Sequence, residues 1–298
     1  MNGALELAPA KINLSLFVGP TRADGRHELV TLFQSVDLAD ELTIVPAEPA
    51  TVDEVVCEGV DGPNLVADAL AALRAAGWEA PPVRVTIAKR IPVAAGMGGG
   101  SADAAAMLRH ASRLARVDAA AVEAIAARLG ADVPGQLRPG ASLGTGAGDV
   151  VQAVGDLPAH GVLVLPQTFS LSTPDVYREA DRLGLPRASE RLAALTAELQ
   201  GWLQAPLGPP PDRLIANDLQ LAALSLRPDI SIALERALDV DADQALVCGS
   251  GPTAIGIFWG YDGIDRARAA ASRVAAIHPG AVAAAPVLRG VAGSTPND

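Results

Sequence analysis

The chain has 298 residues and a formal net charge of −11, so it lacks the basic surface of nucleic-acid-binding proteins and no nucleic-acid partner is expected. No apolar run approaches the length that spans a bilayer, and the start shows no signal-peptide pattern, which predicts a cytoplasmic protein without a membrane partner. Its two cysteines, Cys57 and Cys248, stand far apart without metal-ligand spacing, which argues against a disulfide framework or a zinc site.

Strands and one helix are predicted for the first ninety residues. Asn64 can cap a helix over 64–78, whose apolar residues recur at helical spacing and whose end is marked by Gly77. Strand composition marks the segments 11–18, 29–38, 41–47, 51–58 and 83–91.

A run of glycines follows the last of these strands. The sequence "PVAAGMGGGSADA" (92–104) leads into a predicted helix over 101–115, with Ser101 as N-cap and Asp103 in the first turn. A glycine-rich turn before a helix N-terminus can bind phosphate through exposed backbone N–H groups. A flexible loop without a ligand is the alternative, but the place between strand and helix favours a phosphate site. The spacing matches neither a P-loop nor G-x-G-x-x-G.

The rest of the chain mixes helices and strands, which predicts an α+β or α/β protein with a domain boundary near residue 155. A helix over 118–130 is followed by a turn-rich segment in which Pro134 should stop any helix. Thr173 is the expected cap of the next helix after that boundary. The remaining predictions are strands at 161–166 and within 244–259, helices over 173–184, 189–203, 228–238 and 262–276, and a disordered tail at 290–298.

Three motifs resemble those of one enzyme family. "PVAAGMGGGSADAAA" is similar to the phosphate loop of the GHMP kinases, "PAKINLSL" (9–16) to their N-terminal motif and "CGSGPTAIGIF" (248–258) to their third motif. The resemblance implies an α+β fold with a ribosomal-S5-like N-terminal domain (1–155) that binds ATP. It also implies a ferredoxin-like C-terminal domain (156–298) on the substrate side.

Two further segments narrow the implied activity. "DGRHELVTLFQSVDLADELTI" (24–44) and "GADVPGQL" (130–137) resemble the family members that phosphorylate a hydroxyl of a cytidine-diphosphate-linked polyol in non-mevalonate isoprenoid synthesis. Two alternatives remain open. One is a kinase of the same family with another small alcohol substrate, and the other is a non-catalytic regulator that binds a nucleotide or a sugar.

The resemblance implies that Asp132 is the catalytic base and that Lys11 pairs with it and offsets charge on the transferred group. The alternatives are that Asp132 only caps a turn and that Lys11 is a surface lysine. Lysine is rare here, because only Lys11 and Lys89 occur among 23 basic residues. A lysine at position 11 is therefore less easily explained as a generic positive charge, although Lys89 has no evident site.

The implied cofactors are ATP and Mg²⁺, and the hydroxyl of Ser101 is a candidate for contact with the metal. The resemblance assigns ATP to Pro92, Val93, Ala94, Ala95, Gly96, Met97, Gly98, Gly99, Gly100, Ser101 and Ala102.

The cytidine end of the substrate is assigned to Asn13, Arg26, His27 and Tyr177. Each of the two rings has an alternative without a ligand. His27 could be a turn residue whose hydrogen bonds stay within the protein, and Tyr177 could be a helix residue that packs on the core. The family pattern has tyrosine where this chain has Arg26, whose guanidinium plane can stack on a base instead. The third motif contributes Gly249, Ser250, Gly251 and Thr253 to the substrate side, unless they only form a tight hairpin.

Overall fold

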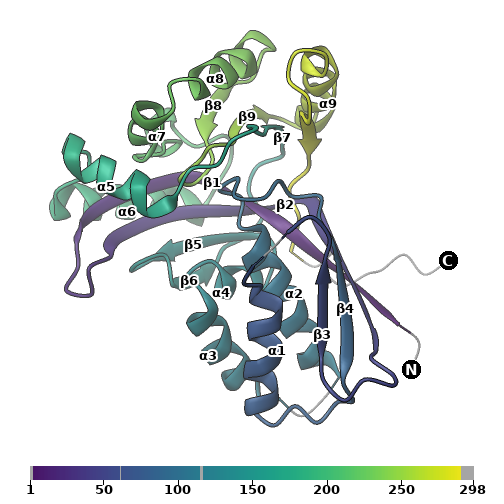
Figure 1. The fold of residues 1–298 in the computed structure, drawn as a ribbon. Helices are drawn as coiled ribbons and strands as arrows, with labels where there is room; N and C mark the ends of the chain where they lie inside the picture. Colours follow the sequence, from purple (N-terminus) through teal and green to yellow (C-terminus); the bar gives the residue numbers. More distant parts are fainter. Residues whose placement is uncertain (1–2, 61, 115–116, 290–298) are drawn as a thin grey trace. The chain divides into compact units, whose positions relative to one another are not determined.

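The computed structural model describes residues 3–60, 62–114 and 117–289, so the tail predicted as disordered (290–298) lies outside the described residues. Two long strands, β1 (Ala4–Thr21) and β2 (His27–Pro46), begin the chain (Figure 1). The chain forms two compact units, to each of which β1 and β2 contribute. The first unit comprises residues 1–10, 38–92 and 98–138, and the second comprises residues 11–37, 93–97 and 139–298. The division into domains 1–155 and 156–298 stays a prediction.

The first unit is a layer of strands covered by helices. β4 (Val83–Ala88) pairs antiparallel with the end of β2 and parallel with β3 (Glu54–Cys57). Alternate residues of β4 are buried, which gives the strand one face toward the helices. The core is rich in alanine, because several alanines of the helix at 99–113 are fully buried. The helices of this unit are α1 (Leu65–Ala75), α2 (Gly99–Arg113), α3 (Ala119–Leu129) and α4 (Val133–Gln136).

The predicted helix over 64–78 is confirmed as α1 together with its end signals. The side chain of Asn64 accepts a hydrogen bond from the amide of Val66 at 2.9 Å. Gly77 follows the helix with φ = 87°, the left-handed conformation that glycine adopts without steric cost.

Two predictions at the start of α2 are wrong. The helix begins at Gly99, and Gly98 stands at the N-cap position in the left-handed conformation, with φ = 70°. Ser101 therefore lies inside the first turn and is not the N-cap, and Asp103 lies beyond that turn. Because glycine reaches positive φ at little cost, the chain enters the helix three residues earlier than the serine would direct it.

Proline and threonine signals elsewhere also need correction. Pro134 does not stop a helix, because it lies in the first turn of α4, where its missing N–H would have no helical partner. Thr173 is the first residue of α5, and Ser172 occupies the N-cap position. Among the helices of the described residues, none combines the length and apolarity that a membrane crossing requires.

The second unit contains two sets of paired strands. The start of β2 pairs antiparallel with β5 (Ala141–Thr145), which pairs with β6 (Val150–Ala153). A four-stranded antiparallel sheet has the order β10-β7-β9-β8. Its strands are β7 (His160–Leu165), β8 (Gln244–Val247), β9 (Ala254–Trp259) and β10 (Val282–Ala284).

Five α-helices and a 3₁₀ turn (Asp212–Leu214) belong to the described part of this unit. One buried cluster joins α8 and α9 to the four-stranded sheet, and a second joins α5, α7 and part of β1. The helices are α5 (Thr173–Leu183), α6 (Ser189–Gln204), α7 (Gln220–Leu226), α8 (Ile230–Asp239) and α9 (Gly263–Val274).

Candidate active site

Lys11 is a buried lysine in the middle of β1, and only 7% of it is exposed, so the surface-lysine alternative is wrong. Its Nζ donates to Oδ1 of Asn13 at 2.8 Å, and Nδ2 of Asn13 donates to Oγ1 of Thr31 at 2.8 Å. Thr31, on β2, donates to the carbonyl of Ser15 at 2.7 Å. This chain of hydrogen bonds fixes the amide of Asn13 and places a buried ammonium beside it.

The third motif is a hairpin between β8 and β9 that packs against the start of the glycine run. A Cβ on Gly96 would lie 2.3 Å from the carbonyl oxygen of Cys248, and one on Gly249 would lie 2.9 Å from the carbonyl oxygen of Gly96. Only glycine permits so close an approach of two backbones. The same Gly249 Cβ would be 3.5 Å from Nζ of Lys11, whose amide donates to the carbonyl of Met97 at 3.0 Å.

The structure therefore brings together three segments that are distant in sequence: the lysine of the first motif, residues 93–97 and the third motif. The third motif forms the predicted hairpin, and its contact with substrate stays a prediction. Oγ of Ser250 lies 2.8 Å from Oγ1 of Thr173, at the start of α5. Oγ1 of Thr253 is buried and has no hydrogen-bond partner in the described part of the chain.

Asn217 supports this hairpin and was not assigned a role in the sequence analysis. Its Nδ2 donates to the carbonyls of Val247 and Gly249, at 2.7 Å each. Its Oδ1 accepts from the amide of Leu219 at 2.9 Å, a turn typical of asparagine before a helix. Apart from the segment "NDLQ" (217–220), which fits the family resemblance, the sequence signals this role only by that local turn, because the two carbonyls lie about thirty residues further along the chain.

Two side chains predicted for the cytidine end meet in the second unit. The rings of His27 and Tyr177 stack with centroids 5.4 Å apart and an interplanar angle of 22°. Nδ1 of His27 lies 2.9 Å from the carbonyl of Gly19, and Nε2 lies 3.3 Å from the carboxylate of Asp181. Both ring nitrogens thus have partners, and His27 is 7% exposed.

Asp181 is a second residue that the sequence analysis missed. It lies four residues after Tyr177 on α5, so both side chains lie on one face of that helix. This spacing is a weak signal, because a carboxylate four residues after an aromatic residue is common on exposed helices.

Arg26 is engaged with carboxylates of its own loop and of the 145–150 turn. Its Nη2 lies 3.0 Å from Asp24 and 3.3 Å from Asp149, and its side chain is half exposed. The amide and guanidinium of Arg26 lower the pKa of Asp24. The role of Arg26 as a wall of the cytosine site stays a prediction.

A buried charge cluster lies directly under the first turn of α2, in the first unit. Nζ of Lys89 pairs with Asp40 and with Asp103, the latter at 2.8 Å. A Cβ on Gly99 would lie 3.2 Å from that Nζ. Burial raises the pKa of Asp103 to about 6, although Lys89 acts to lower it. Lys89 thus has a structural site, which the sequence did not reveal because its partners lie 49 and 14 residues away.

Some residues of the glycine run are buried and others are exposed to solvent. Ala95 and Met97 are buried, so they contribute to the core, while Val93 and Gly100 are exposed. Ala94 adopts φ = 54°, which is unusual for a residue with a side chain. Gly100 and the half-buried Ser101 in the first turn of α2 are the members best placed to meet a ligand.

Asp132 stands at the N-cap position of α4 and is half buried. Its side chain makes no capping hydrogen bond to α4. The choice between a base and a cap of the turn after Gly130 stays open. Asp132 belongs to the first unit and Lys11 to the second. Their pairing stays a prediction.

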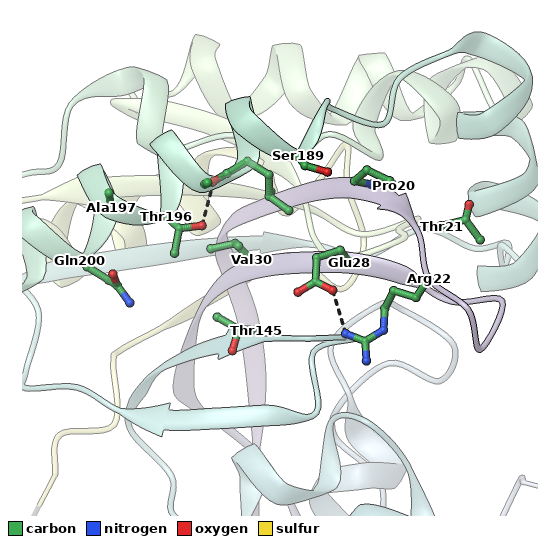
Figure 2. Close-up of a pocket in the computed structure, with 12 residues that line it drawn as sticks. Pro20, Thr21, Arg22, Glu28, Val30, Thr145, Ser189, Thr196, Ala197 and Gln200 are labelled. Atoms are coloured by element: carbon green, nitrogen blue, oxygen red, sulfur yellow. Dashed lines mark hydrogen bonds and ion pairs between the residues drawn. The ribbon is translucent and has the colours of Figure 1, made fainter.

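A cavity of about 580 Å³ opens in the second unit beside α6 (Figure 2). The ion pair between Arg22 and Glu28, at 2.8 Å, lies at its edge opposite the helix. None of the residues predicted for the site lines this cavity. Its lining is Pro20, Thr21, Arg22, Glu28, Val30, Thr145, Ser189, Leu192, Ala193, Thr196, Ala197 and Gln200.

Two family models match the sequence of this chain. The model of the GHMP kinases N terminal domain matches residues 64–140, and that of the GHMP kinases C terminal matches residues 204–277. A homoserine kinase from Cytophaga hutchinsonii superposes with a TM-score of 0.64 at 18% identity, covering 97% of this chain and 96% of its own, which shows the shared fold.

Closer relatives share one name. The 4-diphosphocytidyl-2-C-methyl-D-erythritol kinase of Nocardioides sp. is 40% identical over 83% of this chain and 86% of its own length. That of Streptomyces coelicolor is 43% identical over 82% and 84%. A crystal structure of 4-(cytidine 5'-diphospho)-2C-methyl-D-erythritol kinase has a TM-score of 0.76 at 32% identity, covering 95% and 99%. This chain belongs to the GHMP kinases, among the 4-diphosphocytidyl-2-C-methyl-D-erythritol kinases.

Proposed function

We propose that this chain transfers the γ-phosphate of ATP to a hydroxyl of 4-diphosphocytidyl-2-C-methyl-D-erythritol, in the non-mevalonate route to isoprenoids. The observation that carries the proposal is that relatives of that name align over more than four fifths of both chains at 40% and 43% identity. The chain is accordingly an ATP-dependent kinase with an alcohol as acceptor.

In this proposal Asp132 accepts the proton of the attacking hydroxyl, and Lys11 offsets negative charge on the transferred phosphoryl group. The half-buried position of Asp132 at the start of α4 supports the first role. The burial of Lys11 supports the second, because an ammonium acts more strongly on nearby charge where water is excluded. Asn13 orients that ammonium through its amide oxygen.

The first turn of α2 binds the phosphates of ATP in this proposal. Its amides have no helical acceptor, and Gly100 is exposed. No group of three or more metal-binding side chains occurs among the described residues. Mg²⁺ that arrives on ATP keeps phosphate and water ligands, so a single protein hydroxyl such as that of Ser101 fits it. Bound Mg²⁺ would neutralise phosphate charge.

The cytidine end is proposed to lie at the stacked pair of His27 and Tyr177. An aromatic ring that already stacks on another offers its second face to a base at little entropic cost. His27 would bind the cytosine edge by exchanging one of its present partners, of which Asp181 is the more exposed.

The decisive test is an assay of ADP release from ATP and Mg²⁺ with four acceptors: the cytidine compound, mevalonate, homoserine and galactose. We expect turnover with the cytidine compound and, for Asp132→Asn, a loss of kcat of at least about 100-fold at unchanged nucleotide binding. Turnover with another alcohol would favour a different substrate. Nucleotide binding without turnover on any acceptor would contradict a kinase.

A second candidate function, a GHMP kinase with another alcohol acceptor, is favoured by one observation. Arg26 stands where the family pattern has a tyrosine, and its guanidinium pairs with Asp24 and Asp149. The same panel of acceptors separates the two candidates.

A further inference from the structure

We infer that Arg109 is a positioning residue: its one guanidinium holds the turn that carries Asp132 against the part of β1 that belongs to the first unit. The inference rests on the proposed function for the role of Asp132. Arg109 lies on α2, three turns of chain after the glycine run, and it is no member of the three motifs.

The guanidinium makes two short hydrogen bonds within the first unit. Nη1 donates to the carbonyl of Gln136 at 2.6 Å, and Nη2 donates to the carbonyl of Leu7 at 2.6 Å. Gln136 is the last residue of α4, which begins directly after Asp132. Leu7 lies in β1, four residues before Lys11. Arginine suits this place, because its planar fork reaches two acceptors at a fixed angle, which a lysine cannot do.

α4 depends on such outside support. A helix of one turn is not stable by itself, because nucleation costs more than its few bonds return. The hydrogen bonds donated by its backbone amides are long: those from Gln136 N to Asp132 O and from Leu137 N to Pro134 O both measure 3.3 Å. Val133 anchors the front of the turn in the alanine-rich core, and Arg109 satisfies the carbonyl at its end. The backbone of Asp132 is thus fixed by the turn that follows it.

Arg109 keeps its charge for this role. Burial lowers its pKa to about 10, and Glu6 acts in the opposite direction. The guanidinium therefore stays protonated at neutral pH, and both of these bonds go to backbone carbonyls rather than to a carboxylate. A charged donor strengthens a hydrogen bond to a neutral carbonyl.

Arg113 provides a matched control one turn further along α2. It pairs with the carboxylate of Glu6, and its side chain is 55% exposed. Loss of Arg113 removes one ion pair on the same helix without touching α4 or the carbonyl of Leu7 that Arg109 binds. A general weakening of α2 would affect both variants alike.

The test compares Arg109→Met, Arg109→Lys and Arg113→Met in steady-state kinetics. We expect kcat to fall by about 10- to 100-fold in Arg109→Met, with KM for ATP and for the cytidine substrate within about two-fold. Arg109→Lys should recover part of kcat, and Arg113→Met should keep it. In an Asp132→Asn background, Arg109→Met should add no further loss, because the residue it positions is already gone.

A second readout is independent of turnover. Hydrogen exchange should speed up at the amides of Val133, Gly135, Gln136 and Leu137 in Arg109→Met and not in Arg113→Met. If the wild type shows no kinase activity but exchange is still faster in Arg109→Met, the proposed function is wrong and the role of Arg109 in holding α4 stands. Equal exchange in both variants, or a loss of kcat in Arg109→Met that adds in full to that of Asp132→Asn, would overturn the inference.

Discussion

At the scale of single residues, the two lysines of this arginine-rich chain show why so few remain. Each Nζ is a compact charge that approaches oxygen atoms in a confined space: Asn13 for Lys11, and Asp40 and Asp103 for Lys89. A planar guanidinium would need more room and a different geometry. Both lysines therefore have oxygen partners in the structure, although the sequence analysis expected a site only for Lys11 and found none for Lys89.

Arg26 permits a prediction at the same scale. In the stacking hypothesis its guanidinium lies on the cytosine face, at the cost of the present pairs with Asp24 and Asp149. Arg26→Ala should weaken binding of the cytidine substrate by about two- to five-fold, the size of an exposed cation–π contact. Calorimetric titration of the wild type and of this variant measures it.

Arg182→Ala is the control for this titration, because Arg182 is another exposed arginine in an ion pair, with Glu179 on α5. Unchanged affinity in Arg26→Ala would rule out the stacking role. An equal loss in both variants would indicate a general effect of charge.

At the scale of elements, the helix with clear signals at both ends was predicted well, whereas the starts of α2 and α4, at Gly98 and Pro134, were not. The side chain of Asn64 and the position of Gly77 defined α1 locally. The start of α2 was missed because the left-handed conformation of Gly98 leaves no trace in hydrophobic spacing. α4 was missed because proline breaks a helix only beyond its first turn.

The glycine run allows its packing and binding roles to be separated by two matched substitutions. Gly96→Ala places a Cβ 2.3 Å from the carbonyl of Cys248, at φ = 77°. We expect a loss of at least about 2 kcal/mol in the free energy of unfolding. Gly100→Ala places its Cβ 3.8 Å from Leu65 inside a helix, so stability should hold or rise by about 0.5–1 kcal/mol.

Urea unfolding and the KM for ATP distinguish the two positions. If amides of the first turn bind phosphate, Gly100→Ala should raise the KM for ATP in a protein of full stability. A Gly96→Ala variant as stable as the wild type would show that the loop does not need its close approach to the hairpin.

At the scale of the whole molecule, the family resemblance supplied what local patterns could not. Stacking of His27 on Tyr177 joins residues 150 positions apart, and Gly96 meets Cys248 across a similar distance. Nothing in the spacing or composition of either segment encodes these contacts. The resemblance assigned His27 and Tyr177 to one end of the substrate, but it did not predict that their rings stack on each other. Asp181 and Arg109 lie outside the motifs and were therefore missed.

A buried histidine should contribute a loss of stability in mild acid. His160 is 5% exposed and packs on Trp259 at 4.9 Å between ring centroids. Its Nδ1 lies 2.7 Å from the carbonyl of Pro158, so this nitrogen carries the proton of the neutral ring. Nε2 has no hydrogen-bond partner within the described residues. Burial lowers the pKa of His160 below its ordinary value, although the bond to Pro158 acts to raise it.

The direction of this change in the free energy of unfolding follows from where protons bind. Below about pH 6.5 the unfolded chain takes up a proton at this histidine, while the folded chain resists one, so the free energy of unfolding falls as the pH falls. This loss continues until the pH passes the folded pKa. His160→Gln should reduce the slope by up to about 1.4 kcal/mol per pH unit. Urea unfolding at pH 7.5, 6.0 and 5.0 measures it, and parallel curves for wild type and variant would contradict the assignment. His278, whose pKa is also lowered by burial, should account for part of the slope that remains.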